Sequence, residues 1–205
     1  SRGVMSQLEA PISTASRMTK PQRRTGETAD PGRRLNPRII DSDWLLMRGM
    51  SKVITALAAE TVRPGASVLD FGCGSKPYEP LFAAAGARYL GADFDGAPDI
   101  DISADGRIQS ADTHDMVVSF QVLEHVRDLE LYFAEARRVL ADDGRMILST
   151  HGTWLYHPHP EDHRRWTRQG LINEIERNGF EVIRCEPVVG PMGWTHMIRI
   201  TGICY

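Results

Sequence analysis

A tight glycine turn after a short apolar run constrains the fold of this chain more than any other feature. The run Val68–Leu69 leads into Asp70, and the turn that follows carries Gly72 and Gly74. Without a Cβ atom, both glycines can adopt positive φ and let a ligand lie almost against the backbone. Open α/β sheets bind ligands at the carboxyl ends of their strands. The pattern therefore predicts a cofactor site at the end of a parallel strand.

The ligand that this turn favours is not a dinucleotide. The dinucleotide fingerprint needs a third glycine at position 77 for close helix packing, and this chain has Pro77 there. Asp70 would repel an anionic phosphate and attract a cationic ligand group. A second acid, Asp93, ends the next apolar segment 19 residues after Gly74, the spacing at which an acid meets ribose hydroxyls. The corner therefore favours a nucleoside ligand that carries positive charge.

The segment Val68–Ser75 resembles motif I of the class I S-adenosylmethionine-dependent methyltransferases. The resemblance covers about residues 66–187, and the matching stretches are residues 68–75, 89–93, 115–126, 144–150 and 165–182. The last of these is typical of the methyltransferase-11-like subgroup, which is often found in small-molecule or glycan biosynthesis. The resemblance implies S-adenosylmethionine as cofactor, with S-adenosylhomocysteine as its product. It also implies an α/β fold with a doubly wound, mostly parallel, seven-stranded sheet and helices on both faces.

The resemblance also implies a set of cofactor contacts. They are Asp70, Gly72, Gly74, Asp93, Phe94, Asp105, Phe120 and Gln121. In the family, the acid that corresponds to Asp93 binds both ribose hydroxyls. An acid after the third strand usually binds the adenine amino group; Asp105 is the better match, and Asp101 is the alternative because the segment 105–115 is shorter than the family pattern. Phe94 and Phe120 fit a cofactor contact or a place in the core.

A histidine-rich segment follows the expected fifth strand. Residues 151–166 hold four of the seven histidines, mixed with aromatic residues, and should lie over the carboxyl edge of the sheet. Methyl transfer depends on alignment of the nucleophile with the breaking C–S bond. A hydroxyl nucleophile must also lose its proton, and histidine is a natural base for that step. We predict that His151, which directly follows the strand, or His157 is the base.

Other roles stay open for these residues. The histidine–proline pairs at 157–160 can be rigid extended backbone. A metal ion could be held by the histidines with Glu161 or Asp162, but the spacing matches no established ligand set, so we predict no metal site. Glu124 and His125, after the expected fourth strand, either face the site or fix the loop that enters the next helix.

Composition and charge predict one domain of ordinary size behind a basic segment. Residues 1–40 carry eight Lys or Arg against three Asp or Glu and include four prolines. We expect this segment to be flexible or to form a lid, and the methyltransferase domain to span 41–205. No apolar run reaches the length of a membrane span, the N-terminus lacks a signal-peptide core, and three cysteines show no metal spacing. These features predict a cytoplasmic protein.

The predicted activity is methyl transfer from S-adenosylmethionine to a small molecule, with oxygen as the expected acceptor atom, in sugar or natural-product biosynthesis. An RNA or protein methyltransferase is the main alternative. The Asn/Asp-Pro-Pro-Tyr/Phe tetrapeptide of DNA amino-methylating enzymes is absent at Ser119–Val122, and the basic segment lacks aromatic residues for base stacking. A non-catalytic, cofactor-binding partner subunit is a third option. The sequence leaves the oligomeric state open, with a homodimer as one option.

Overall fold

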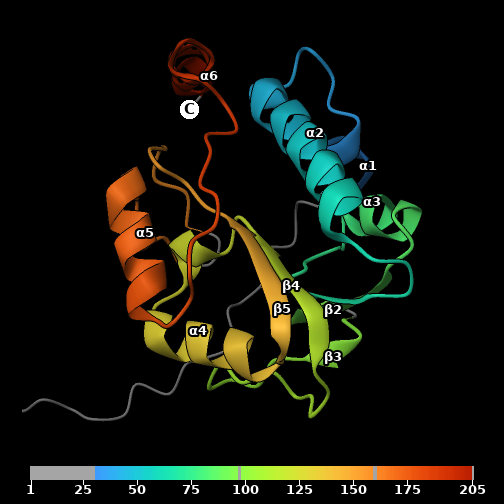
Figure 1. Ribbon diagram of the computed structural model, residues 1–205. Helices are drawn as coiled ribbons and strands as arrows, with labels where there is room; N and C mark the ends of the chain where they lie inside the picture. The colour runs from blue at the N-terminus through green and yellow to red at the C-terminus, as the bar shows by residue number, and fades with distance from the viewer. Residues whose placement is uncertain (1–30, 97, 159–160, 205) are drawn as a thin grey trace, which may run out of the picture.

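A parallel sheet forms the centre of the computed structural model, which describes residues 31–96, 98–158 and 161–204 (Figure 1). The strands are β1 (Ser67–Phe71), β2 (Arg88–Asp93), β3 (Ile100–Asp101), β4 (His114–Phe120) and β5 (Leu140–Ser149). Their order is β3-β2-β1-β4-β5, and every neighbouring pair is parallel. From β1 the chain adds β2 and β3 toward one edge of the sheet, and it then returns to the other side of β1 to add β4 and β5. The order of the strands therefore reverses between β1 and β4. In open α/β sheets, ligands bind beyond the carboxyl ends of the strands at such a point of reversal.

Helices cover both faces of this sheet. On one face α2 (Trp44–Thr61) and α3 (Glu79–Ala84) pack their apolar side chains against β1, β2 and β4. On the other face α4 (Leu129–Arg138) and α5 (Arg168–Arg177) pack against the same strands and β5. The doubly wound architecture predicted from the sequence is confirmed. Among the described residues, no helix has both the length and the apolar character needed to cross a membrane.

The described part of the N-terminal segment lies against α2. The short helix α1 (Pro31–Leu35) is joined to the start of α2 by Arg33, whose Nη2 lies 2.6 Å from Asp43 Oδ1 and whose Nε lies 3.6 Å from Asp41 Oδ2. Leu35 packs against the core cluster on the α2 face. The expectation of a flexible or lid-forming segment concerns residues 1–40, and residues 1–30 of it lie outside the described part of the chain.

The sheet differs from the prediction in its strand count. We expected seven strands, and the described residues form five. Residues 181–187 run without strand pairing, and Ile183 is 79% exposed there. The chain then enters the helix α6 (Pro191–Cys204). Proline suits the first turn of a helix, and among the described residues no strand pairs with 181–187.

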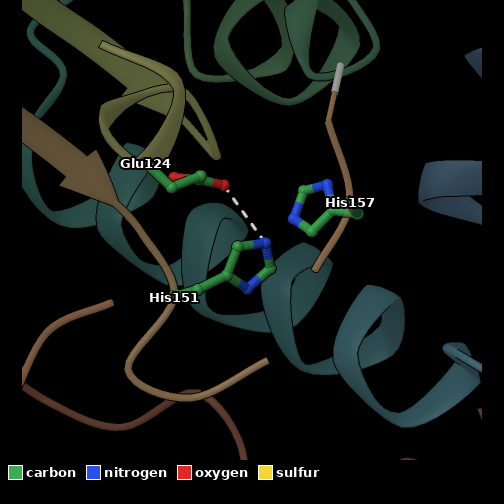
Figure 2. Close-up of side chains that lie close together, drawn as sticks. All are labelled: Glu124, His151 and His157. Atoms are coloured by element: carbon green, nitrogen blue, oxygen red, sulfur yellow. Dashed lines mark ion pairs between the residues drawn. The ribbon is translucent and has the colours of Figure 1, made fainter. Parts of the chain in front are cut away.

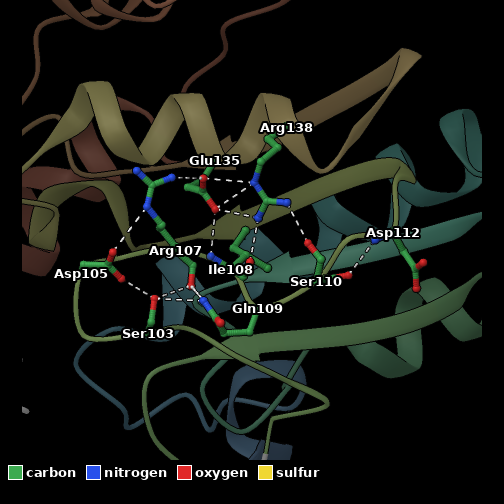
Figure 3. A network of polar contacts seen from close by, with 9 residues as sticks. All are labelled: Ser103, Asp105, Arg107, Ile108, Gln109, Ser110, Asp112, Glu135 and Arg138. Carbon is green, nitrogen blue, oxygen red and sulfur yellow. Dashed lines mark hydrogen bonds and ion pairs between the residues drawn. The ribbon is translucent and has the colours of Figure 1, made fainter.

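A buried carboxylate joins α4 to the loop that leads into β4 (Figure 3). The Glu135 side chain is 3% exposed; it accepts a hydrogen bond from Ile108 N at 2.9 Å and one from Arg138 Nη2 at 2.7 Å. Arg138 then donates to the carbonyls of Ile108 and Ser110, both at 2.7 Å. A charged group buried in this way is stable only while its partners remain. The network therefore fixes the loop between β3 and β4.

Replacing Glu135 with glutamine is expected to lower the free energy of unfolding by about 2 kcal/mol, because charge-assisted hydrogen bonds to Arg138 and Ile108 are weakened. Urea unfolding measures the change. Arg107→Ala is the matched control, since Arg107 is 59% exposed and lies 3.5 Å from Glu135 Oε1; this substitution should change the free energy by less than about 0.5 kcal/mol. Equal losses in the two variants would contradict the role given to the buried carboxylate.

Candidate active site

The turn after β1 takes the left-handed conformation at Gly72 (φ 85°), Gly74 (φ 53°) and Lys76 (φ 53°). A Cβ atom on Gly72 would lie 2.6 Å from Val122 Cγ2, so this glycine is required by packing against the loop after β4. A Cβ atom on Gly74 would have no neighbour within 4 Å among the described residues. Gly72 therefore closes the turn on the protein side, and Gly74 presents bare backbone to open space.

Asp93, at the end of β2, fastens this turn. Its Oδ2 accepts a hydrogen bond from Gly74 N, and its Oδ1 accepts one from Phe94 N, both at 2.7 Å. Each carboxylate oxygen keeps a second lone pair for a ligand hydroxyl. The 19-residue spacing seen in the sequence therefore brings the second acid directly against the glycine turn.

The two candidate acids for the adenine group lie in different surroundings. Asp101 ends β3 in register with Asp93, at the same edge of the sheet. Asp105 lies on an exposed turn, where its carboxylate accepts a hydrogen bond from Ser103 Oγ and lies 3.4 Å from Arg107 Nε. Asp101 is thus the register partner of Asp93 in the sheet, whereas Asp105 belongs to the loop network of Figure 3.

Asp70 lies beneath the turn and is 2% exposed. Its Oδ2 accepts a hydrogen bond from the Tyr89 hydroxyl. Burial raises the pKa of Asp70 from its ordinary 3.8 to about 7; the bond from Tyr89 opposes this rise, and the charge of Asp93 adds to it. A cationic group above the turn would favour the ionised form of Asp70.

The contribution of Asp70 to the free energy of unfolding should fall as pH rises from about 4 to about 7. Its pKa is higher in the folded chain than the ordinary 3.8, so the folded state binds more protons in this window and loses stability as they leave. Asp70→Asn removes the titration. Urea unfolding at a series of pH values should give a wild-type curve that falls relative to the Asp70→Asn curve. Parallel curves would show that Asp70 does not titrate there.

The end of β4 also carries a strained residue. Gln121 has φ 59°, a conformation that costs about 1 kcal/mol or more outside glycine. Its backbone N donates to Ser149 O at 3.0 Å, and its Nε2 donates to Ser149 Oγ at 3.1 Å, so the turn is held to the end of β5. Phe120 is a core residue that packs on Tyr78 and Phe82. Phe94 is partly buried against the opposite core cluster.

A carboxylate and two imidazoles converge beyond these strand ends (Figure 2). Glu124 belongs to the short 3-10 helix η1 (Leu123–His125) and its side chain is fully buried. Its Oε1 lies 3.1 Å from His151 Nε2, and its Oε2 accepts a hydrogen bond from Thr150 Oγ1 at 2.9 Å. Although burial raises the pKa of Glu124, the neighbouring His151 side chain holds it below its ordinary value. Glu124 is therefore an anion paired with His151.

The His157 ring completes this group, which we call the histidine cluster: Glu124, His151 and His157. The His157 ring centroid lies 5.0 Å from that of His151 and 5.1 Å from that of His125. Burial lowers the pKa of His157 to about 4, and the neighbouring imidazoles act in the same direction. His157 is therefore neutral at physiological pH.

The segment that carries His157 is held by a second ion pair. Asp162 Oδ2 accepts a hydrogen bond from His157 N at 2.9 Å and one from Arg165 Nη2 at 2.7 Å. The bonds from Arg165 hold the pKa of Asp162 far below its usual range. His163 N donates to Glu124 O at 2.9 Å, which fastens the segment to η1. The sequence left the role of Glu124 undecided and gave no sign of the Asp162–Arg165 brace.

The glycine corner fits the cofactor that the resemblance implies. Gly74 leaves room for a ligand against the backbone, and Asp93 offers carboxylate lone pairs to ribose hydroxyls. An ammonium or sulfonium group above the turn would favour the ionised form of Asp70 and be attracted to it. These residues would hold S-adenosylmethionine, while the histidine cluster lies beyond the neighbouring strands β4 and β5.

Comparison with known proteins agrees with this fit. The family described as "Methyltransferase domain" matches residues 45–184. A probable S-adenosylmethionine-dependent methyltransferase of Mycolicibacterium smegmatis is 31% identical over 137 residues, which are 58% of this chain and 53% of that protein. A ubiquinone biosynthesis O-methyltransferase of Rhizobium rhizogenes is 29% identical over 110 residues, 44% of each chain. The chain spans about half the length of the curated relatives that it matches.

Solved structures share the fold at low identity. A 1,6-didemethyltoxoflavin-N1-methyltransferase of Burkholderia thailandensis aligns with TM-score 0.58 and 21% identity, over 71% of this chain and 73% of that one. A magnesium protoporphyrin IX methyltransferase of Synechocystis, with bound S-adenosylmethionine, aligns with TM-score 0.53 and 21% identity, over 78% and 84%. The predicted family, fold and cofactor are confirmed. The chain belongs to the class I S-adenosylmethionine-dependent methyltransferases.

Proposed function

We propose that the chain transfers a methyl group from S-adenosylmethionine to a hydroxyl oxygen of a small molecule in sugar or natural-product biosynthesis. The observation that supports this best is the histidine cluster, because oxygen nucleophiles need a proton acceptor and the cluster follows the ends of β4 and β5. Relatives named for O-methylation in ubiquinone biosynthesis support a small acceptor.

The cluster provides a route for the acceptor proton. S-adenosylmethionine supplies an electrophilic methyl group when it is bound. His151 follows β5 directly and is oriented by Glu124 at 3.1 Å, a carboxylate that stabilises the imidazolium formed when His151 takes the hydroxyl proton. The oxygen then bonds to the methyl carbon as the C–S bond breaks, and the electron pair of that bond stays on sulfur. His157 is the second candidate base, since it is neutral and adjacent.

The acceptor class can be tested with methyl-labelled S-adenosylmethionine and metabolite extracts. We expect label in a small molecule, as a methyl ether. Label found only in RNA or protein would replace this proposal with a macromolecular acceptor, and binding of S-adenosylhomocysteine without any labelled product would favour a non-catalytic partner subunit.

His151→Ala is expected to reduce kcat with the labelled acceptor at least about 100-fold, because the proton loses its acceptor. His163→Ala is the matched control in the same segment; His163 Nε2 lies 2.9 Å from Glu161 Oε2, outside the cluster. Single-turnover rates measure both variants with the cofactor saturating. Unchanged turnover in His151→Ala would exclude His151 as the base.

A further inference from the structure

The histidine cluster has the geometry of a metal site. One ligand atom from each of Glu124, His151 and His157 lies within 4.8 Å of the other two, and the close-up in Figure 2 shows all three side chains directed at one point. Glu124 Oε1 and His151 Nε2 are 3.1 Å apart. Ligand atoms in a tetrahedral zinc site lie about 3.4 Å apart. Side-chain shifts on the order of 1 Å would therefore bring the three ligand atoms to the separation that zinc requires.

The donor chemistry selects among metals. Two imidazole nitrogens and one carboxylate oxygen are the three protein ligands of several catalytic zinc sites, in which a fourth position stays open for water or substrate. Magnesium and calcium prefer sets made of oxygen alone. Methyl transfer changes no oxidation state of a metal, so an ion without redox chemistry suffices. The set therefore favours zinc.

We propose that Glu124, His151 and His157 bind one Zn²⁺ ion whose open position takes the hydroxyl oxygen of the acceptor. This inference rests on the proposed function and deepens it, because it concerns how the hydroxyl becomes a nucleophile. Coordination lowers the pKa of the bound hydroxyl, its proton leaves to water, and the oxygen bonds to the methyl carbon while the C–S bond breaks toward sulfur. With the ion bound, both histidines act on the hydroxyl through the metal.

Neighbouring residues orient the three ligands as outer-shell groups do in metal sites. Thr150 Oγ1 donates to Glu124 Oε2 at 2.9 Å and leaves Oε1 turned toward the histidines. His151 stacks on Trp154 with the ring planes 8° apart. Asp162, braced by Arg165, holds the backbone of His157. Each ligand is thus fixed by a contact that does not use its metal-facing atom.

Titration calorimetry of the chelator-treated full chain with Zn²⁺ tests the site. We expect one equivalent to bind and the melting temperature to rise. His151→Ala and His157→Ala should each weaken binding at least about 100-fold, and Thr150→Val about tenfold. His163→Ala, the matched histidine of the same segment, should bind like the wild type. Circular dichroism of each variant without zinc checks that it is folded.

Two results would overturn the proposal: no stoichiometric zinc binding by the wild type, or an equal loss in His163→Ala. Titration with S-adenosylhomocysteine on the same samples separates this failure from failure of the proposed function. A chain that binds the nucleoside and labels a small molecule without zinc remains a methyltransferase in which a histidine takes the proton directly. A chain that binds zinc but not the nucleoside would contradict the proposed function and leave the metal site standing.

Discussion

Replacing Asp93 with alanine is expected to weaken the binding of S-adenosylhomocysteine at least about 100-fold, or by about 2.7 kcal/mol. The carboxylate can accept hydrogen bonds from both ribose hydroxyls, and bonds to a charged group contribute about 1.5–3 kcal/mol each. Titration calorimetry with the product is the direct measurement, because the product binds without reacting.

The control must separate ligand contact from support of the turn, because Asp93 also accepts hydrogen bonds from Gly74 N and Phe94 N. Asp93→Asn keeps one side-chain oxygen as an acceptor and so one of these two backbone bonds; it should lose about tenfold in affinity and show a smaller fall in melting temperature than Asp93→Ala. Asp95→Ala removes an exposed acid from the same loop and should leave affinity unchanged. Wild-type affinity in Asp93→Ala would remove this residue from the cofactor site.

The glycine corner could be predicted because its determinants are local. Gly72 and Gly74 directly follow β1, and Asp93 ends β2. Neighbouring parallel strands place their carboxyl ends at one edge of the sheet. The cap of α5 is local in the same sense: Thr167 Oγ1 accepts a hydrogen bond from Gly170 N at 3.0 Å.

The histidine cluster could not be predicted as a unit. Glu124 and His151 are far apart in the sequence, and they meet because β4 and β5 are neighbours and η1 turns the carboxylate back toward the end of β5. The short spacing in the sequence therefore pointed to Glu161 and Asp162 as the acids that could complete a metal site, and it did not point to Glu124. In the structure Asp162 pairs with Arg165, and Glu161 pairs with Arg127 and His163.

The difference between the five observed strands and the seven expected ones has a related cause. Whether residues 181–187 form a strand depends on what lies beside them, and that information is absent from their own sequence. The chain that follows forms the helix α6 and gives residues 181–187 no strand to pair with among the described residues.

The two glycines of the corner should respond differently to substitution by alanine: Gly72→Ala should mainly reduce stability, and Gly74→Ala should mainly reduce ligand affinity. Gly72→Ala is expected to lower the free energy of unfolding by roughly 3–5 kcal/mol, since it adds a left-handed non-glycine residue and a collision with Val122. The added Cβ would lie 2.6 Å from Val122 Cγ2 at φ 85°. Gly74→Ala is expected to lose only about 1 kcal/mol because its Cβ enters open space.

Affinity for S-adenosylhomocysteine should show the reverse order in molecules that remain folded. The Cβ of Gly74→Ala enters the space through which the ligand approaches the backbone, so this variant should lose at least about tenfold in affinity while keeping its melting temperature within a few degrees. The double variant Gly72→Ala/Val122→Ala isolates the collision: removing both methyl groups of Val122 should restore the steric part of the lost stability and leave the part due to φ. If Gly74→Ala bound the nucleoside like the wild type, the ligand would not lie against this turn, because the added methyl group would occupy the space that such a ligand needs.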